Sequence, residues 1–186
     1  MTEERSSDAP RTRTTRASIF IRAPIEKVWA QITKRDGLQA QFFNARMDTP
    51  GLEVGAPIRM RSGDGVYTSV VGEVLEFDPP HRFSHTFRFT TLDDPWCRVT
   101  YELKEAEGGT EFTLISEDIP VDTKTEGYMA QGNTFITEVL KGVCEDGRPP
   151  LKYRLMLTVM GWTAFMTPER CRSEHWPFDD AQQEST

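Results

Sequence analysis

An ordered series of short signals between residues 19 and 147 limits this chain to very few folds. A β-rich segment leads directly into an amphipathic helix that starts near Pro24, and a long helix closes the series. Between them, a Pro79-Pro80 corner joins two strands and a Gly108-Gly109 turn joins two more. Strands joined by tight turns form antiparallel sheets. Because helices flank these strands in the sequence, the series predicts an α+β fold.

Periodicity locates the first elements. Residues 17–21 predict a strand. Pro24 suits the first position of a helix, because its missing N–H has no helical partner there. The apolar residues after it recur with the spacing of one helical face, and they are Ile25, Val28, Trp29 and Ile32. A second short helical turn is expected at residues 38–41.

The pattern from about residue 43 to residue 119 is typical of strands. Turn residues separate five runs, which are predicted as strands at residues 58–61, 67–77, 81–89, 97–104 and 112–119. Gly72 interrupts one run and predicts a β-bulge that helps the sheet to curl. Residues 129–144 return to helical spacing, and Gly147 followed by two prolines ends that helix. Its apolar stripe contains Gly132, Phe135, Ile136, Val139, Leu140 and Val143.

Composition divides the chain into three parts. Residues 1–16 are polar and are predicted to be a disordered tail. Residues 17–148 are predicted to form one ligand-binding domain, and residues 149–186 a C-terminal extension with an apolar helix. The twelve residues from Leu155 to Met166 carry no charge, so we expect this helix to pack on the domain or on a second copy. It is too short to span a bilayer, which needs about 20 apolar residues.

Four motifs, in this order, resemble the bacterial homologues of the activator of heat-shock protein 90 ATPase, within the START and Bet v 1-like superfamily. They are Ile21-x-Ala-Pro-x-x-x-Val-Trp29, Phe42-Phe43, Gly72-x-Val-x-x-x-Asp-Pro-Pro-x-Arg-Phe83, and Val99-Thr-Tyr-x-Leu103 followed by Gly108-Gly-Thr-x-Phe-Thr-Leu114. The resemblance covers about residues 17–147. It implies a helix-grip fold, in which a curved antiparallel sheet wraps around a long C-terminal helix, with two short helices after the first strand. It also implies a ligand cavity between sheet and helix, and it transfers no catalytic residue.

Strand alternation identifies candidate site residues. From His81 to Phe89 every second side chain is aromatic or histidine, and the side chains between them are polar. We expect the aromatic side to face the long helix, with His85 among phenylalanines. The predicted ligand-binding residues are Phe83, His85, Phe87, Phe89, Tyr101, Phe112, Leu114, Phe135, Ile136, Val139 and Leu140. Arg59 and Arg61 alternate with the inward Met60 and are expected to be solvated.

Three functions stay open at this point. The first is binding of a small apolar or amphipathic molecule, because ligand cavities are mostly apolar with few polar groups. The second is a cyclase-like or hydrolase-like enzyme that uses His85 or Tyr101 as an acid–base. The third is a co-chaperone-like regulator of the heat-shock protein 90 ATPase. A simpler alternative to the first two is that His85 is an ordinary core histidine, whose nitrogens are hydrogen-bonded to neighbouring groups or to water.

Other partners and cofactors are not expected. The net charge of −7 argues against nucleic acid. Phosphate-loop, dinucleotide, zinc-protease and hydrolase motifs are missing, so no cofactor is predicted. His81 and His85 lie about 13 Å apart in a strand, and the three cysteines have no zinc spacing, so no metal is predicted. Without a secretory signal, a cytoplasmic location and no membrane insertion are expected, with a homodimer as one option.

Overall fold

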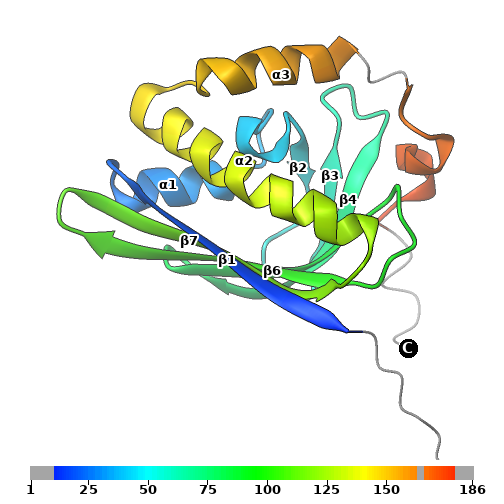
Figure 1. Cartoon of the computed structure of the whole chain (residues 1–186), viewed down its shortest axis with the longest axis horizontal. Helices are drawn as coiled ribbons and strands as arrows, with labels where there is room; N and C mark the ends of the chain where they lie inside the picture. The colour runs from blue at the N-terminus through cyan, green and yellow to red at the C-terminus, as the bar shows by residue number, and fades with distance from the viewer. Residues whose placement is uncertain (1–10, 163–165, 179–186) are drawn as a thin grey trace, which may run out of the picture.

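The computed structural model describes residues 11–162 and 166–178, and its centre is one antiparallel sheet (Figure 1). Seven strands pair in the order β1-β7-β6-β5-β4-β3-β2. The strands are β1 (Thr12–Ile21), β2 (Arg46–Asp48), β3 (Pro57–Arg61), β4 (Thr68–Asp78), β5 (Arg82–Phe89), β6 (Cys97–Ala106) and β7 (Gly109–Pro120). The helices are α1 (Ile25–Ile32), α2 (Lys124–Asp146) and α3 (Leu151–Trp162), with 3-10 turns η1 (Ala40–Phe42), η3 (Glu169–Cys171) and η4 (Ser173–His175). The predicted α+β helix-grip architecture is confirmed.

The first strand begins earlier than the sequence predicted. β1 starts at Thr12, whereas residues up to 16 were expected in a disordered tail, and for residues 12–16 that expectation was wrong. Thr12 pairs with Pro120 and Arg16 with Ile115 of β7. This pairing supplies backbone hydrogen bonds to a segment that has no apolar pattern of its own, and threonines suit a pleated strand. Residues 1–10 of the expected tail lie outside the described residues.

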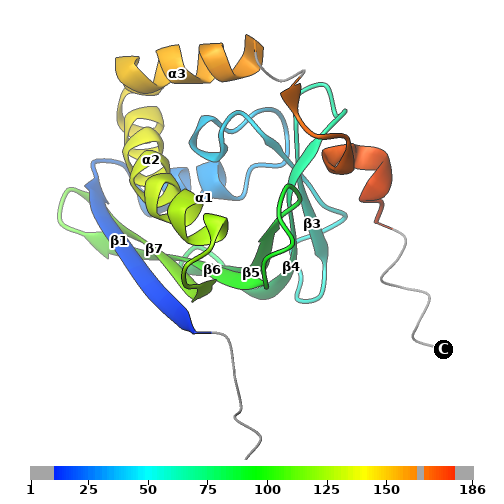
Figure 2. The ribbon, with the colours of Figure 1, turned by 45° about the vertical axis from the view of Figure 1, so that its right-hand side comes forward.

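The sheet is strongly curved, and Figure 2 shows β3 and β4 rising away from the plane of β1, β7 and β6. The strand pairing shifts by one residue at two places near the bend. One shift lies between Met60 and Arg61, where β3 pairs with β4, and the other between Val74 and Glu76, where β4 pairs with β5. The bulge that Gly72 predicted is therefore misplaced, because the register is unshifted from Val71 to Val74. Bulges increase twist and bend a strand, and here they lie on both sides of β4.

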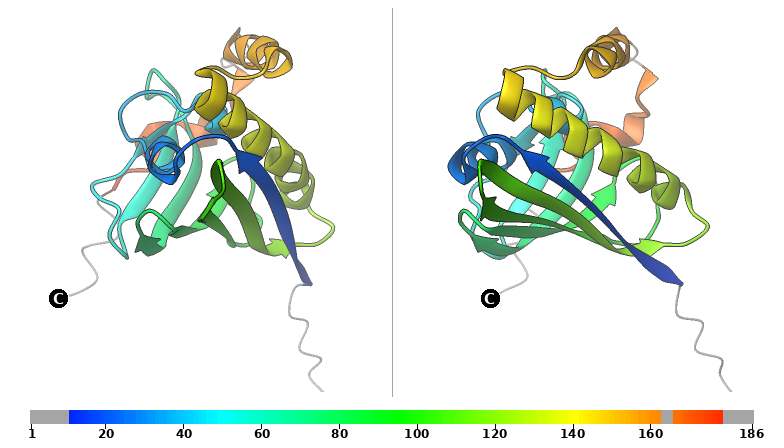
Figure 3. Two further views of the ribbon diagram at one scale, coloured as in Figure 1. Left: turned by 90° about the vertical axis from the view of Figure 1, so that its left-hand side faces the viewer. Right: turned by 60° about the vertical axis from the view of Figure 1, so that its left-hand side comes forward.

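Helix α2 lies in the concave side of the sheet, over β1 and β7 (Figure 3). It starts five residues before the predicted Met129, because the Thr123 side chain caps it by accepting a bond from the Glu126 N–H at 3.2 Å. Gly147 ends it in the left-handed conformation, as expected of a glycine after a helix. The helix thus has one end at the β7 loop and the other at the turn into α3.

The interior contains two groups of buried apolar side chains. The main core joins α1, the concave face of the sheet and one side of α2, including Leu140. A smaller group joins α2 to α3 through Phe135, Val139 and Leu157. The apolar residues that were predicted to form one stripe on α2 therefore lie on two different faces of the helix. Phe135 and Val139 pack toward α3 rather than toward the sheet, because α3 covers that side of α2.

The C-terminal extension contains the predicted apolar helix, α3, which lies on α2 on the side away from the sheet (Figure 1). Residues 163–165 of that prediction lie outside the described residues. Residues 166–178 then run down the outer side of β3 and β4 (Figure 2). The polar tail after Phe178 is also outside the described residues.

Candidate functional site

The concave wall of the sheet brings five of the predicted residues together. Phe83, His85, Tyr101, Phe112 and Leu114 are all buried. Phe83 is paired in register with Tyr101, and Tyr101 with Leu114. Ring centroids lie 5.4 Å apart for Phe83 and His85, and 6.1 Å for Tyr101 and Phe112. The wall is therefore an aromatic cluster with one imidazole inside it.

His85 and Tyr101 form a buried polar pair at the centre of this cluster. The exposed fractions are 5% for His85 and 4% for Tyr101. His85 Nδ1 lies 2.7 Å from the Thr86 carbonyl oxygen, which can only accept, so Nδ1 carries the proton. His85 Nε2 is then an acceptor for the Tyr101 hydroxyl at 3.4 Å. The pair is arranged as a hydrogen-bonded chain from phenol to imidazole to backbone.

Burial keeps both groups of this pair neutral. It lowers the pKa of His85 to about 4, although the bond to Thr86 opposes the shift. Burial likewise raises the pKa of Tyr101 well above its usual range. Acid–base catalysis is most efficient when the pKa lies near the working pH. The pair is therefore better suited to hydrogen bonding than to proton transfer at pH 7.

Gly72 makes the bond of His85 to Thr86 possible. A Cβ atom at Gly72 would lie 2.1 Å from the Thr86 oxygen and 3.4 Å from His85 Nδ1. Only a glycine leaves room for the carbonyl and the imidazole here. The sequence analysis identified Gly72 as a special position but predicted a bulge there. In the structure, this glycine instead allows the two strands to approach closely.

A second polar pair joins the sheet to α2. Ser116 is on the same cross-strand row as His85, because His85 pairs with Val99 and Val99 with Ser116. The Ser116 hydroxyl donates to Asn133 Oδ1 at 3.4 Å, and Asn133 Nδ2 donates to the Thr15 hydroxyl at 2.8 Å. Sequence reasoning missed Asn133. Its signal was an amide side chain within the apolar stripe of the predicted helix, and Thr137, one turn later, is buried too.

The turn after α1 covers the aromatic wall. Phe42 lies over Tyr101 with ring centroids 5.9 Å apart, and Phe43 stacks on Phe135 at 4.1 Å. Phe43 and Asn44 both have positive φ, at 57° and 58°. A bulky residue in the left-handed region is strained. The turn is thus held over the wall with a strained Phe43 backbone by its aromatic contacts and by the hydrogen bonds of the buried Gln39 and Gln41.

The aromatic side chains of β5 become more exposed to solvent toward the end of the strand that lies near the start of α2. Phe87 and Phe89 are half-buried and meet edge to face, with centroids 4.8 Å apart. Phe89 meets Tyr128 of α2 at 5.6 Å, and Tyr128 is exposed. The aromatic cluster therefore continues from the core to the surface at the start of α2.

The remaining predicted residues are divided between the two sides of α2. Leu140 belongs to the main core, and Ile136 packs against both groups. Two surface hollows occur elsewhere: one of about 640 Å³ at the turn between α2 and α3, and one of about 730 Å³ between α1 and β2. Neither is lined by a residue of the aromatic cluster.

Within residues 11–162 and 166–178, no three His, Cys, Asp or Glu side chains gather closely enough to hold a metal ion. Over the same part of the chain, no helix combines the length and the apolar character that crossing a bilayer requires.

A known family matches most of this fold. The model of the family described as activator of Hsp90 ATPase homolog 1-like protein matches residues 22–145. This chain belongs to that family. The match runs from the residue after β1 to the last turn of α2, so it includes the strands that carry the aromatic cluster. No curated protein sequence matches the chain.

Solved structures share the fold of this activator-like domain at low sequence identity. A protein from Mesorhizobium loti is 22% identical with a TM-score of 0.59, covering 70% of this chain and 96% of that one. An HSP90 activator from Plasmodium falciparum is 19% identical with a TM-score of 0.56, covering 68% and 92%. The Aha1 dimer from Colwellia psychrerythraea is 20% identical with a TM-score of 0.57, covering 72% and 96%. At such identities the likeness establishes the fold, and one fold hosts many functions.

Proposed function

We propose that this activator-like domain binds a small, mainly apolar molecule that carries one hydrogen-bonding group. The observation that carries the proposal is the His85–Tyr101 pair, which is buried in an aromatic wall and kept neutral. Sites for small molecules combine apolar lining with a few placed polar groups. A ligand hydroxyl can accept from the Tyr101 hydroxyl and donate to His85 Nε2, and it would replace the long contact between them.

Space for the ligand would come from movement of the turn that contains Phe42 and Phe43. Phe42 now occupies the position over Tyr101. The strained backbone at Phe43 lowers the cost of leaving this conformation. Entry would follow the line of Phe87, Phe89 and Tyr128, where the cluster reaches the surface. Phe42→Ala is expected to tighten binding, because the ring no longer has to be displaced.

The test uses 1-naphthol, an aromatic alcohol, and decanoic acid as probes in thermal-shift and native mass measurements. We expect at least one probe to raise the Tm and to bind as one molecule per chain. Tyr101→Phe keeps the ring and removes the hydroxyl, so affinity should fall about five- to tenfold, the effect of roughly one hydrogen bond.

His81→Gln is the matched control, because His81 is an exposed histidine beside the same strand, and it should leave binding unchanged. Equal affinity of the wild type and Tyr101→Phe would remove the proposed role of the pair. No binding by either probe to Phe42→Ala would argue that the interior is only a core.

A homodimer is the second part of the proposal. The described surface of α3 exposes Leu151, Leu155 and Val159, which are one turn apart on one side. A row of this kind can be buried against its own copy across a two-fold axis, and the similar Aha1 protein from Colwellia psychrerythraea is named as a dimer. Analytical ultracentrifugation should find a dimer that Leu155→Glu converts to a monomer, while Arg154→Glu, an exposed residue off this row on the same helix, is the control. A monomeric wild type at high concentration would exclude it.

Regulation of the heat-shock protein 90 ATPase is a second candidate function. Its support is the family match over residues 22–145. ATP hydrolysis by a bacterial heat-shock protein 90 chaperone should then rise when the full chain is added. An unchanged rate at saturating concentrations of this chain would reject the candidate without affecting the ligand proposal.

A further inference from the structure

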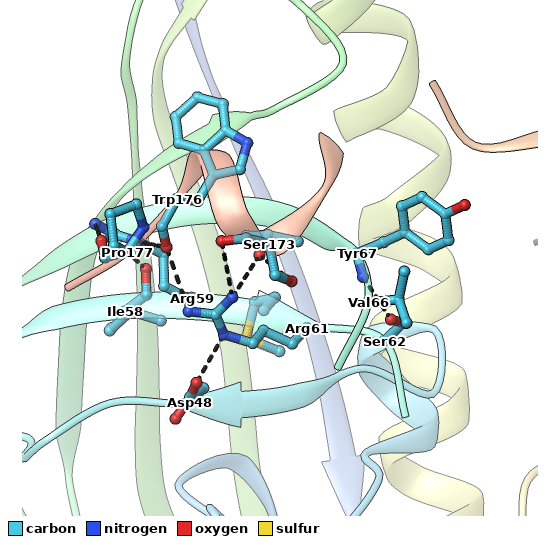
Figure 4. A network of polar contacts seen from close by, with 12 residues as sticks. Asp48, Ile58, Arg59, Arg61, Ser62, Val66, Tyr67, Ser173, Trp176 and Pro177 are labelled. Carbon is cyan, nitrogen blue, oxygen red and sulfur yellow. Dashed lines mark hydrogen bonds and ion pairs between the residues drawn. The ribbon is translucent and has the colours of Figure 1, made fainter. Parts of the chain in front are cut away.

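Arg61 of β3 is surrounded by hydrogen-bond acceptors on the outer face of the sheet (Figure 4). Asp48 Oδ2 accepts from Arg61 Nε at 2.7 Å, and the Trp176 carbonyl accepts from Arg61 Nη2 at 3.2 Å. The side chain of Arg61 is only 11% exposed, so the prediction that it is solvated was wrong. The same prediction was wrong for Arg59, which is half-buried and donates to the Trp176 and Pro177 carbonyls. The local pattern of β3 does not encode the arrival of this C-terminal segment.

Arg46 of β2 lies directly opposite Arg61 but has a different environment. The two residues pair in register across β2 and β3, so their side chains are on one face of the sheet. Arg46 is half-buried, and within residues 11–162 and 166–178 its guanidinium has no ion pair and no hydrogen bond. Like charges that are directly opposite destabilise a sheet. Asp48, on the same strand as Arg46, is bound to Arg61 instead. Arg46 therefore lacks an anion.

Arg46 lines the surface hollow between the end of α1 and β2, which has a volume of about 730 Å³. We call it the β2 hollow. Lys34 and Arg35, from the loop after α1, line it too. Sites for small molecules have volumes of about 300–1,000 Å³. The β2 hollow is thus large enough for a small molecule and has three cations in its wall.

The dipole of α1 accounts for only two of these cations. Lys34 and Arg35 follow the C-terminal end of the helix, where positive charge is favourable. Arg46 belongs to a strand, and its direct neighbour across the sheet is itself a cation. A further reason is therefore needed for a third cation in this wall.

The carboxylates of the wall do not balance its cations. Asp36 and Asp48 line the β2 hollow, but Asp48 is bound to Arg61 at 2.7 Å. Within the part of the chain that the structure describes, neither Lys34 nor Arg35 has an ion pair. The wall therefore has an excess of positive charge, although the net charge of the whole chain is −7.

The same wall offers acceptors for hydroxyl groups. The Thr33 hydroxyl donates to the Trp29 carbonyl at 2.8 Å, and the Thr49 hydroxyl donates to the Gly51 carbonyl. Because the hydrogen of each hydroxyl is already used, each oxygen can only accept from a ligand. The ionised carboxylate of Asp36 likewise only accepts. The β2 hollow thus combines cations for an anion with acceptors for hydroxyl groups.

We propose that the β2 hollow binds a small hydroxylated phosphate ester of the sugar-phosphate type. The guanidinium groups of Arg35 and Arg46 match phosphate oxygens with parallel N–H bonds, and Lys34 adds a point charge. The hydroxyl groups of the ligand donate to Asp36. The phosphate supplies the anion that Arg46 lacks and offsets the repulsion from Arg61. This site is separate from the proposed interior site, because the β2 hollow is lined by no residue of the aromatic cluster.

The test uses the full chain and ribose 5-phosphate, with ribose as the matched probe that lacks the phosphate. Isothermal titration calorimetry should find one molecule of ribose 5-phosphate per chain and no binding of ribose. Amide NMR signals should shift at residues 33–36 and 46–49 but not at His85 or Tyr101. Raising the salt concentration should weaken binding, because charged groups carry it.

Substitutions in the wall locate the phosphate. Arg46→Gln should weaken binding at least tenfold, the effect of a hydrogen bond to a charged group. The same change should raise the Tm of the free protein, because it removes the repulsion from Arg61. Loss of binding with a higher Tm separates the loss of a site from the loss of the fold. Arg35→Gln, in an exposed loop, should weaken binding as well, whereas Lys124→Gln, an exposed lysine at the start of α2, should not.

Three results would overturn the proposal. The first is that ribose 5-phosphate does not bind, or binds no more tightly than ribose. The second is that neither Arg35→Gln nor Arg46→Gln weakens binding. The third is that vesicles containing phosphatidic acid bind the chain while ribose 5-phosphate does not, because the cations would then serve a lipid surface.

Discussion

Gly72 and Thr86 lie so close across β4 and β5 that a Cβ atom on the glycine would be 2.1 Å from the Thr86 carbonyl oxygen. That oxygen is also the acceptor for His85 Nδ1. One position without a side chain thus leaves room for the carbonyl that assigns the tautomer of His85, and with it the direction of its bond to Tyr101. This relation connects the backbone of the sheet to the candidate site.

Replacement of Gly72 by alanine should therefore be costly. Gly72→Ala should lower the free energy of unfolding by more than about 2 kcal/mol, because backbone atoms must move. Gly132→Ala is the matched control, since a Cβ there meets no atom within 4 Å, and it should stabilise α2 by up to about 1 kcal/mol. Urea denaturation measures both, and similar effects of the two changes would contradict the close approach.

Stability should depend on pH through His85. Its pKa is lowered to about 4 from 6.5 in the unfolded chain, so the unfolded state binds the proton first as pH falls. Stability is therefore complete above about pH 6.5 and is lost between pH 6.5 and 4, by about 2 kcal/mol at pH 4.5.

The variant His85→Gln isolates this effect from the carboxylates of the chain. Its loss of unfolding free energy between pH 7 and pH 4.5 should be smaller than that of the wild type by the same amount. Denaturant titrations at both pH values provide the comparison. Parallel losses in the two proteins would mean that His85 is not buried as a neutral group.

The start of α2 should depend on its cap. Thr123→Ala removes the acceptor for the Glu126 N–H and should cost about 1 kcal/mol, with faster amide exchange in the first turn. Thr158→Ala is the comparison, because the Thr158 hydroxyl donates to the Arg154 carbonyl within the same exposed helix, α3. Its effect should stay within about 0.5 kcal/mol. Unaltered exchange after Thr123→Ala would show that tertiary packing alone holds this end.

Two leucines of α3 should respond differently to truncation. Leu157 is 7% exposed and packs on Phe135 and Val139, so Leu157→Ala should cost about 2–3 kcal/mol. Leu155 is 68% exposed, and Leu155→Ala should change the unfolding free energy of the monomer by less than about 0.5 kcal/mol. Thermal unfolding at low concentration measures both. Equal losses would place α3 in a different orientation on α2.

Several parts of the fold follow from local pattern. The alternation of Ile58 and Met60, and of Phe83 and His85, correctly predicts which side of each strand is buried. The glycine at residue 147 predicts the end of α2. These signals are readable because they depend on the conformational preferences of neighbouring residues.

Other features required the folded chain. Phe135 and Val139 have the same helical spacing as Leu140, yet α3 covers them, so no periodicity distinguishes them. The buried amide of Asn133 finds hydrogen-bond partners only because the fold places Ser116 of β7 and Thr15 of β1 next to it. Such contacts join residues that are far apart in the sequence.

The sequence by itself determined the order of elements, the inward faces of the strands and the family resemblance. Only the tertiary structure decided that Thr12 begins a strand, that Gly72 admits a carbonyl, and that Ser173 and Trp176 cover Arg61. The physical reason is the separation, along the chain, of the residues that interact. Backbone propensity and side-chain alternation act between neighbours along the chain, whereas strand pairing, close approach and the burial of a charge depend on which distant segment arrives to meet them.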